Sequence, residues 1–223
     1  MKKGGLGRTL YYFTCKAQLY MAGILAGSFV MAIYQWFLIS DDALNLSDIM
    51  DRTTVMLAFI TFLVLFTAGM EFVQKWLAVL VSFGCSRKNV FLGGIAMHLQ
   101  IILESLVLFE VLMWFSGWDR NTLLLSLAAA LYLVSQGISQ LMGAAAQKWG
   151  RTAGLVLAIV FFIFGVAMAN LLLAGRPPGA LLQWVQEMIK PVWQCFLVAV
   201  AGAFCVVANL VSYHIIRRYE VKL

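Results

Sequence analysis

Long apolar stretches recur along this chain, and they limit its possible folds more than any other feature of the sequence. Six of them, each close to the roughly 20 residues that a helix needs to cross a bilayer, lie at residues 19–39, 53–69, 90–115, 122–145, 152–174 and 192–216. Backbone N–H and C=O groups inside the hydrocarbon must bond to one another, which such spans achieve as α-helices. The sequence therefore predicts an all-α integral membrane protein with six transmembrane helices in a single domain, residues 1–223.

Composition supports a membrane protein and argues against nucleic-acid binding. Hydrophobic residues make up 63% of the chain and charged residues 12%, whereas soluble domains are about 45–50% apolar and about 25% charged. The net charge is +6, but the basic residues lie at the ends of apolar stretches. The expected contact is therefore the lipid bilayer and not a nucleic acid. The four cysteines show no paired spacing, so we expect neither a disulfide nor a metal site.

The distribution of Lys and Arg predicts how the chain is oriented. Segments expected on one side contain Lys2, Lys3, Arg8, Lys16, Lys75, Arg87, Lys88, Lys148, Arg151, Arg217, Arg218 and Lys222, and those on the other side contain Arg52, Arg120, Arg176 and Lys190. Cytoplasmic segments carry an excess of basic residues, and the excess here is about threefold. We therefore expect a multi-pass protein of the cell membrane with both termini in the cytoplasm.

Two segments are expected to form helices at the inner membrane surface. Residues 1–18 mix Lys and Arg with Tyr and Phe, which is typical of a helix in the headgroup layer. In residues 71–83, Glu71 and Lys75 are four apart, in the order that stabilises a helix. The expected apolar stripe of this second segment consists of Phe72, Trp76, Val79 and Leu80. It predicts an interfacial extension of the second span, bent away from the bilayer normal.

A third short helix is expected between spans five and six, over residues 178–190. Prolines bound the segment, so it cannot merge smoothly with either neighbouring span. Its apolar residues Leu181, Trp184, Val185 and Met188 recur at helical spacing. The helix is too short to cross the bilayer, so we expect it to lie on the outer leaflet or to dip into it.

The stretch Val81–Gly94 is a short polar break between two apolar stretches. Gly84 can adopt the turn, and Ser86 is a good N-cap for a helix that begins there. Arg87 and Lys88 follow, and paired basic residues between spans are typical of a cytoplasmic loop. These two residues either form a working contact with a partner or serve only as a topological anchor.

Polar side chains within the spans indicate contact with protein or water, because exposure to lipid is costly. Gln100 and Glu104 share one face of the third span, and Gln136 and Gln140 belong to a polar stripe along the fourth span. Each set either lines a translocation path or forms a polar core between packed helices, the more common arrangement for such a stripe. We interpret His98 as a structural residue near the inner side.

Known catalytic and nucleotide-binding motifs are absent from the sequence. The chain has no G-x-x-x-x-G-K-[ST] phosphate loop, no H-E-x-x-H and no G-x-S-x-G. We therefore expect no catalytic residue, no cofactor bound to this chain and no ATP bound through a phosphate loop.

The layout resembles the permease subunits of ATP-binding-cassette (ABC) exporters of type 2. Those proteins have six spans, cytoplasmic ends, a basic and aromatic N-terminal segment and an amphipathic insert between spans five and six. The local match covers Leu80–Gly93, where a coupling helix, a short turn, a Ser-Arg start and small residues follow one another. The family often has Pro in the turn, where this chain has Gly84.

The resemblance implies a homodimer or pseudo-dimer of permeases with two separate ATPase subunits that bind ATP and Mg²⁺. It implies ATPase coupling through Glu71, Lys75, Ser86, Arg87 and Lys88, with a second contact at Lys148 and Arg151. It implies a dimer seam near Gly23, Gly27 and Gly165, and in an exporter Trp184 and Val185 would belong to an outer gate. A passive lid over the span ends is the alternative to the gate.

Two other classes of protein remain open on the sequence. One is the membrane substrate-binding subunit of a vitamin importer, which has a similar length and six spans but needs polar binding residues in its outer loops. The other is a non-transporting immunity or scaffold protein that binds a membrane peptide. Copurification with an ATPase distinguishes the exporter from the scaffold, and tight binding of a vitamin by the chain itself identifies the importer subunit.

The proposed orientation makes a direct prediction for the polar break. Cysteine introduced as Arg87→Cys or Lys88→Cys is expected to react with a membrane-impermeant thiol reagent only from the cytoplasmic side, because the positive-inside rule places this loop there. Labelling of either position from outside intact cells would reverse the topology.

Overall fold

The computed structural model describes residues 6–39, 46–82, 84–115, 122–150, 152–154, 156, 159–160 and 191–217. The elements are α1 (Leu6–Ile39), α2 (Leu46–Glu71), the π-helix η1 (Phe72–Trp76), α3 (Leu77–Ser82), α4 (Arg87–Phe115), α5 (Thr122–Trp149) and α8 (Pro191–Arg217). Within these residues five helices are long and apolar enough to cross a membrane: Gly7–Leu38, Ile49–Ser82, Arg87–Phe115, Thr122–Trp149 and Pro191–Arg217. The described part of the chain is thus an α-helical multi-pass membrane protein.

The expected fifth span, 152–174, lies outside the described residues apart from 152–154, 156 and 159–160. The expected short helix at 178–190 lies wholly outside them. The described helices account for five of the six expected spans, and the sixth span stays a prediction.

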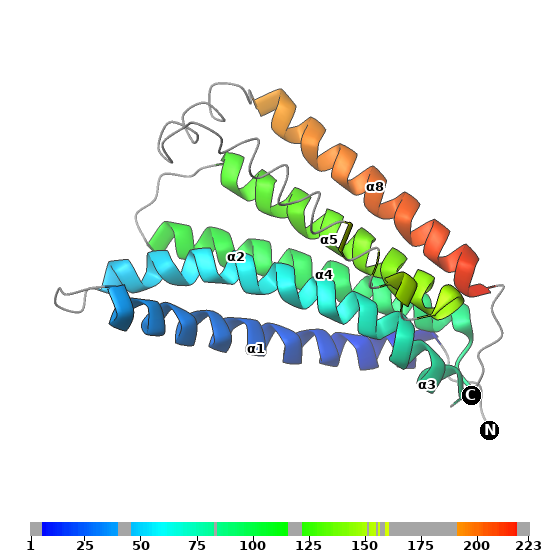
Figure 1. Ribbon diagram of the computed structural model, residues 1–223. Coiled ribbons are helices and arrows are strands. Elements are labelled where there is room, and N and C mark those ends of the chain that lie inside the picture. The colour runs from blue at the N-terminus through cyan, green and yellow to red at the C-terminus, as the bar shows by residue number, and fades with distance from the viewer. Residues whose placement is uncertain are drawn as a thin grey trace.

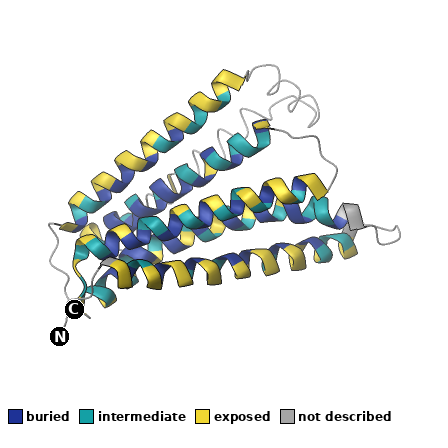
Figure 2. Ribbon diagram, turned by 180° about the vertical axis from the view of Figure 1, so that it is seen from behind, coloured by how far each residue is buried: buried dark blue, intermediate teal, exposed yellow. Residues whose placement is uncertain are grey.

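The described helices form a bundle in which α5 occupies the centre (Figure 1). Helices α1, α2 and α4 pack against one another on one side of α5, and α8 lies along its other side. Figure 2 shows that the outward faces of α1 and α8 are exposed while α5 is largely buried. Large apolar side chains such as Phe29 and Phe37 of α1 and Phe196 and Val207 of α8 are exposed. An apolar exterior over a packed interior is what a lipid environment requires.

The N-terminal part of the chain differs from the expected separate interfacial helix. α1 is a single helix of 34 residues from Leu6 to Ile39, so the basic, aromatic segment and the first span are continuous. Phe13 and Ala17 are buried, and the Phe13 ring lies 5.5 Å from the Phe72 ring, centroid to centroid. These apolar residues pack into the bundle, which stabilises the helix more than immersion in the headgroup layer would.

The expected extension of the second span is helical, and it runs through η1 and α3 to Ser82. The N–H of Leu77 bonds to the carbonyl of Phe72, which is the i→i+5 spacing of a π-helix. The wider turn shifts the buried face, so that Val73 and Leu77 are buried while Val79 is 41% exposed. Of the expected stripe, Phe72 is buried and Trp76 and Leu80 pack against the core, whereas Val79 does not join them.

The turn between α3 and α4 forms as the sequence predicts. Gly84 has a φ of +84°, its N–H donates to the carbonyl of Val81 at 3.0 Å, and the N–H of Cys85 donates to the carbonyl of Leu80 at 3.1 Å. This pair of bonds is the Schellman motif that ends helices at a left-handed glycine. The N–H of Asn89 donates to Ser86 Oγ at 3.2 Å, which confirms Ser86 as the N-cap of α4.

Two consecutive glycines let aromatic rings reach the backbone of α4. A Cβ atom at Gly93 would overlap the ring of Phe13, and one at Gly94 would overlap the ring of Phe72. The Phe72 ring packs against the rings of Phe13 and His98, and the centroid of the His98 ring lies 6.1 Å from that of Phe72. The two glycines therefore position α1 and η1 against the first half of α4.

Gly94→Ala is expected to destabilise the protein by about 1–3 kcal/mol, the usual cost of adding a methyl group to a packed core. Gly202→Ala is the matched control, because nothing lies within 4 Å of a Cβ atom at Gly202. Thermal unfolding of the detergent-solubilised protein measures both. Equal unfolding temperatures for Gly94→Ala and the unaltered chain would show that Phe72 moves aside freely.

Candidate functional site

The described ends of the helices bring most basic residues of the described chain to one end of the bundle. The first residues of α1 and α4, the whole of α3 and the last residues of α5 and α8 meet there (Figure 1). The residues concerned are Arg8, Lys16, Lys75, Arg87, Lys88, Lys148 and Arg217. Their common location is consistent with the side of the membrane that the sequence predicts for them.

The expected coupling segment is fastened to α1 by an aromatic and basic cluster. Lys16 Nζ lies 3.0 Å from the centroid of the Trp76 ring, and the Tyr12 ring lies 6.4 Å from it. Lys75 Nζ contacts Glu71 Oε1 at 2.8 Å, with both side chains exposed. An exposed ion pair of this kind contributes little stability. The cation–π contact of Lys16 is partly shielded from solvent and is the stronger attachment.

Arg87 and Lys88 leave the first turn of α4 in different directions. Successive residues of an α-helix are about 100° apart. Arg87 is half-buried, whereas Lys88 is exposed and stands at the end of a groove that α4, α5 and α8 form. Of these two neighbouring basic residues, only Lys88 therefore lines the groove.

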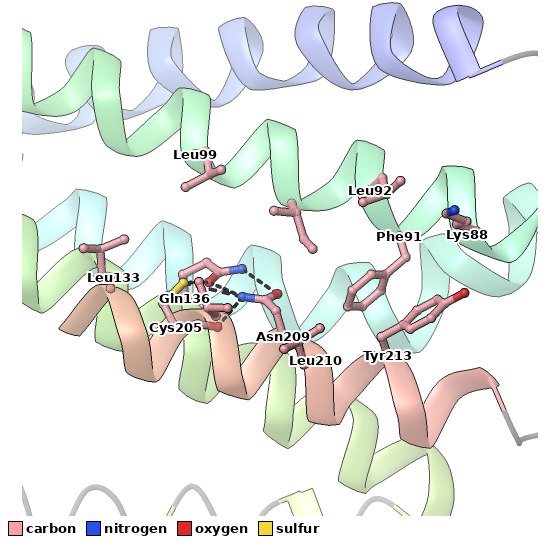
Figure 3. A pocket seen from close by; sticks show the side chains of 13 residues that line it. Lys88, Phe91, Leu92, Leu99, Leu133, Gln136, Cys205, Asn209, Leu210 and Tyr213 are labelled. Atoms are coloured by element: carbon pink, nitrogen blue, oxygen red, sulfur yellow. Dashed lines mark hydrogen bonds between the residues drawn. The ribbon is translucent and has the colours of Figure 1, made fainter. Parts of the chain in front are cut away.

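The groove has a volume of about 460 Å³. Figure 3 shows Lys88 at one end, next to Phe91 and Tyr213, and Leu99 and Leu133 at the other end. The Phe91 and Tyr213 rings lie 5.3 Å apart, centroid to centroid, and join α4 to α8 near Lys88. The remaining lining residues are Leu92, Ile95, Gln136, Gly202, Cys205, Val206, Asn209 and Leu210.

A polar network between α5 and α8 forms the floor of the groove. Gln136 Nε2 donates to Asn209 Oδ1 at 3.2 Å, and Asn209 Nδ2 donates to Gln136 Oε1 at 3.0 Å. Cys205 Sγ donates to the same Gln136 oxygen at 2.8 Å, and Asn209 Nδ2 also reaches the carbonyl of Cys205 at 2.7 Å. The two amides thus bond to each other and to their surroundings.

The four residues expected in a translocation path or a polar core have different hydrogen-bond partners. Gln100 Nε2 donates to Glu104 Oε1 at 2.7 Å, and this half-buried pair lies on α4 outside the groove lining. Gln136 belongs to the network with Asn209. Gln140 is buried, and neither of its amide atoms has a hydrogen-bond partner among the described residues. Gln136 thus belongs to a polar core between α5 and α8, and a place for the other three in a path or a polar core stays a prediction.

Other expected site residues lie apart from the groove or outside the described chain. A Cβ atom at Gly27 would touch Ile60 of α2 at 3.7 Å, whereas nothing lies within 4 Å of one at Gly23. Gly23 therefore borders open surface on α1, and its place in a dimer seam stays a prediction. Arg151, Gly165, Trp184 and Val185 lie outside the described residues.

Sequence reasoning missed the α8 half of the polar network. Asn209 is an amide within an apolar stretch, and Cys205 precedes it by four residues on the same helical face. That pairing was the available signal, because an amide inside a span normally bonds to a neighbouring helix. His98, which the sequence predicts to be structural, is buried: its Nδ1 bonds to the carbonyl of Gly94 at 2.7 Å, whereas its Nε2 has no hydrogen-bond partner among the described residues.

Comparisons with protein-family models, with curated proteins and with solved structures find no match to this chain. A functional assignment therefore depends on the architecture and on the geometry described above.

Asn209→Leu and Gln136→Leu are each expected to destabilise the protein, because each leaves the partner amide buried without its bond. The double variant is expected to lose less unfolding free energy than the two single variants lose together, and the difference, the coupling energy, is expected to be about 0.5–2 kcal/mol. Unfolding in mixed detergent micelles measures all three variants. Ser212→Ala is the control, since Ser212 bonds only to Ala208 of its own helix, at 2.8 Å. Strictly additive losses would mean that the two amides do not stabilise each other.

Proposed function

We propose that this chain is the permease subunit of an ABC exporter of type 2, which forms the translocation path and couples to a separate ATPase. The observation that carries the proposal is the hairpin of α3 and α4. A transmembrane helix continues beyond its apolar part, ends in a Schellman turn at Gly84, and reverses into a span capped by Ser86. The tight turn joins α3 and α4 rigidly. A soluble protein that binds at the turn could therefore move both helices together.

The hairpin is held to the bundle at several points. Lys16 on α1 contacts Trp76, and Phe72 is wedged between Phe13 and Gly94. Packed interfaces of this kind move as rigid bodies rather than deforming continuously. A displacement applied to α3 would therefore be transmitted to α1 and α4 together, which is what alternating access in an exporter requires.

In the proposed assembly two copies of the chain carry two ATPase subunits, and ATP with Mg²⁺ binds to the ATPases. The contact surface comprises the exposed parts of η1 and α3 and the turn, with Glu71, Lys75, Ser86 and Arg87 around it and Lys88 at its edge. Lys148 and Arg151 supply a second, smaller contact. The protein lies in the cell membrane with both termini in the cytoplasm, and this chain itself is not an enzyme.

A photoreactive amino acid tests the coupling surface in native membranes. Placed at Ser82, which is exposed on α3, it is expected to cross-link to a soluble protein that contains a G-x-x-x-x-G-K-[ST] phosphate loop. Placed at Trp114, which is 69% exposed at the opposite end of α4, it should not. Mass spectrometry identifies the cross-linked partner.

Failure to recover such an ATPase from Ser82, with the chain correctly inserted, would contradict the proposal. Tight binding of a vitamin by the purified chain would instead identify an importer subunit. Capture of a membrane peptide without any ATPase would favour a scaffold or immunity protein.

A further inference from the structure

The surface that lines the groove between α4, α5 and α8 is almost entirely apolar. Its polar members Gln136 and Asn209 use their amide groups on each other, and Cys205 donates to the same amide. An extended peptide in this groove would leave backbone N–H and C=O groups without partners inside the membrane, which is costly. A hydrocarbon chain has no such groups, so the groove favours an acyl chain over a peptide.

The length of the groove matches one leaflet of the bilayer. It extends along α4 from Lys88 to Leu99, and eleven residues at 1.5 Å each span about 16 Å. Half of a hydrocarbon core of about 30 Å is about 15 Å. An acyl chain that enters beside Lys88 would therefore reach the far end of the groove near the middle of the bilayer.

The end of the groove at Lys88 supplies a positive charge at the membrane surface. The Lys88 side chain is exposed beside the ring pair of Phe91 and Tyr213 (Figure 3). Basic residues near the membrane surface attract anionic lipid headgroups. Charge, length and lining chemistry thus describe one kind of molecule, an anionic phospholipid of the leaflet at which α4 begins.

We propose that the groove holds one acyl chain of an anionic phospholipid, with the phosphate of that lipid at Lys88. The inference requires no ATPase and no transport, and it takes from the proposed function only the leaflet concerned. Gly202 is the α8 lining residue farthest from Tyr213, so it lies towards the Leu99 and Leu133 end of the groove, and nothing lies within 4 Å of a Cβ atom placed there. A larger side chain at Gly202 would occupy the space of the lipid without displacing the protein around it.

The test uses the full chain in lipid nanodiscs that contain phosphatidylglycerol with a photoreactive group near the end of one acyl chain. Cross-links are expected at the Leu99 and Leu133 end of the groove. Gly202→Phe is expected to lower this cross-linking at least fivefold, whereas Val200→Phe, at a position exposed on α8 outside the groove lining, should leave it unchanged. If Gly202→Phe does not fold, Leu92→Phe fills the groove from α4 instead.

The headgroup is tested by competition with unlabelled phosphatidylglycerol or phosphatidylcholine. Lys88→Gln is expected to reduce the preference for phosphatidylglycerol about fivefold, the effect of one basic residue near an anionic surface. Lys148→Gln is the control, because Lys148 is exposed at the same end of the bundle but does not line the groove.

Three results would overturn the inference. Cross-links spread evenly over the outward faces of α1 and α8 would show only surrounding bulk lipid. Cross-linking that Gly202→Phe and Leu92→Phe leave unchanged would place the lipid elsewhere. An intermolecular disulfide between one copy that carries Leu92→Cys and another copy that carries Leu210→Cys would show that a second protein chain covers the groove.

Discussion

Hydrocarbon cannot form hydrogen bonds, and this constraint determines most of the described structure. It requires the spans to be helices, and it favours polar side chains within them that have a partner in the protein or on their own helix. Ser105 meets Thr61 across α2 and α4 at 3.3 Å, and Ser135 reaches the carbonyl of Phe62 across α2 and α5 at 3.3 Å. Since lipid offers no hydrophobic drive for helices to associate, such bonds and close packing hold the bundle together.

Close packing depends on small residues, and α5 shows how. A Cβ atom at Gly69 of α2 would overlap Ser139 of α5, and one at Gly143 would lie 2.9 Å from Cβ of Val73. On the other face of α5, a Cβ atom at Gly137 would lie 3.3 Å from the backbone of Cys205 in α8. Small residues on both faces allow α5 to contact α2, η1 and α8 together. The polar stripe that the sequence assigns to this helix is thus largely a packing surface, interrupted by the amide network at its edge with the groove.

Features that depend on neighbouring residues could be predicted from the sequence, and features that depend on distant ones could not. The turn at Gly84 and the cap at Ser86 follow from local backbone chemistry, and the spans follow from their length and composition. The π-helix could not be foreseen, because it places Val73 and Leu77 against partners elsewhere in the chain. Nor could the continuity of α1, which depends on the burial of Phe13 against Gly93 of α4. The groove required knowing that α4 and α8 lie beside each other.

The two proposed surfaces are connected through α4. Arg87 and Lys88 leave the same turn, one towards the proposed ATPase contact and the other towards the groove, so a movement of the α3 hairpin would act on both. Phe91 contacts Tyr213 at that end of the groove, while α4 and α8 diverge beyond it (Figure 1). Tilting α4 away from α8 would separate these rings and widen the groove along its length. An acyl chain held there would oppose closure of the groove and favour the wider arrangement, in proportion to its difference in affinity for the two states. The lipid and the ATPase would then act on a single element, the first half of α4.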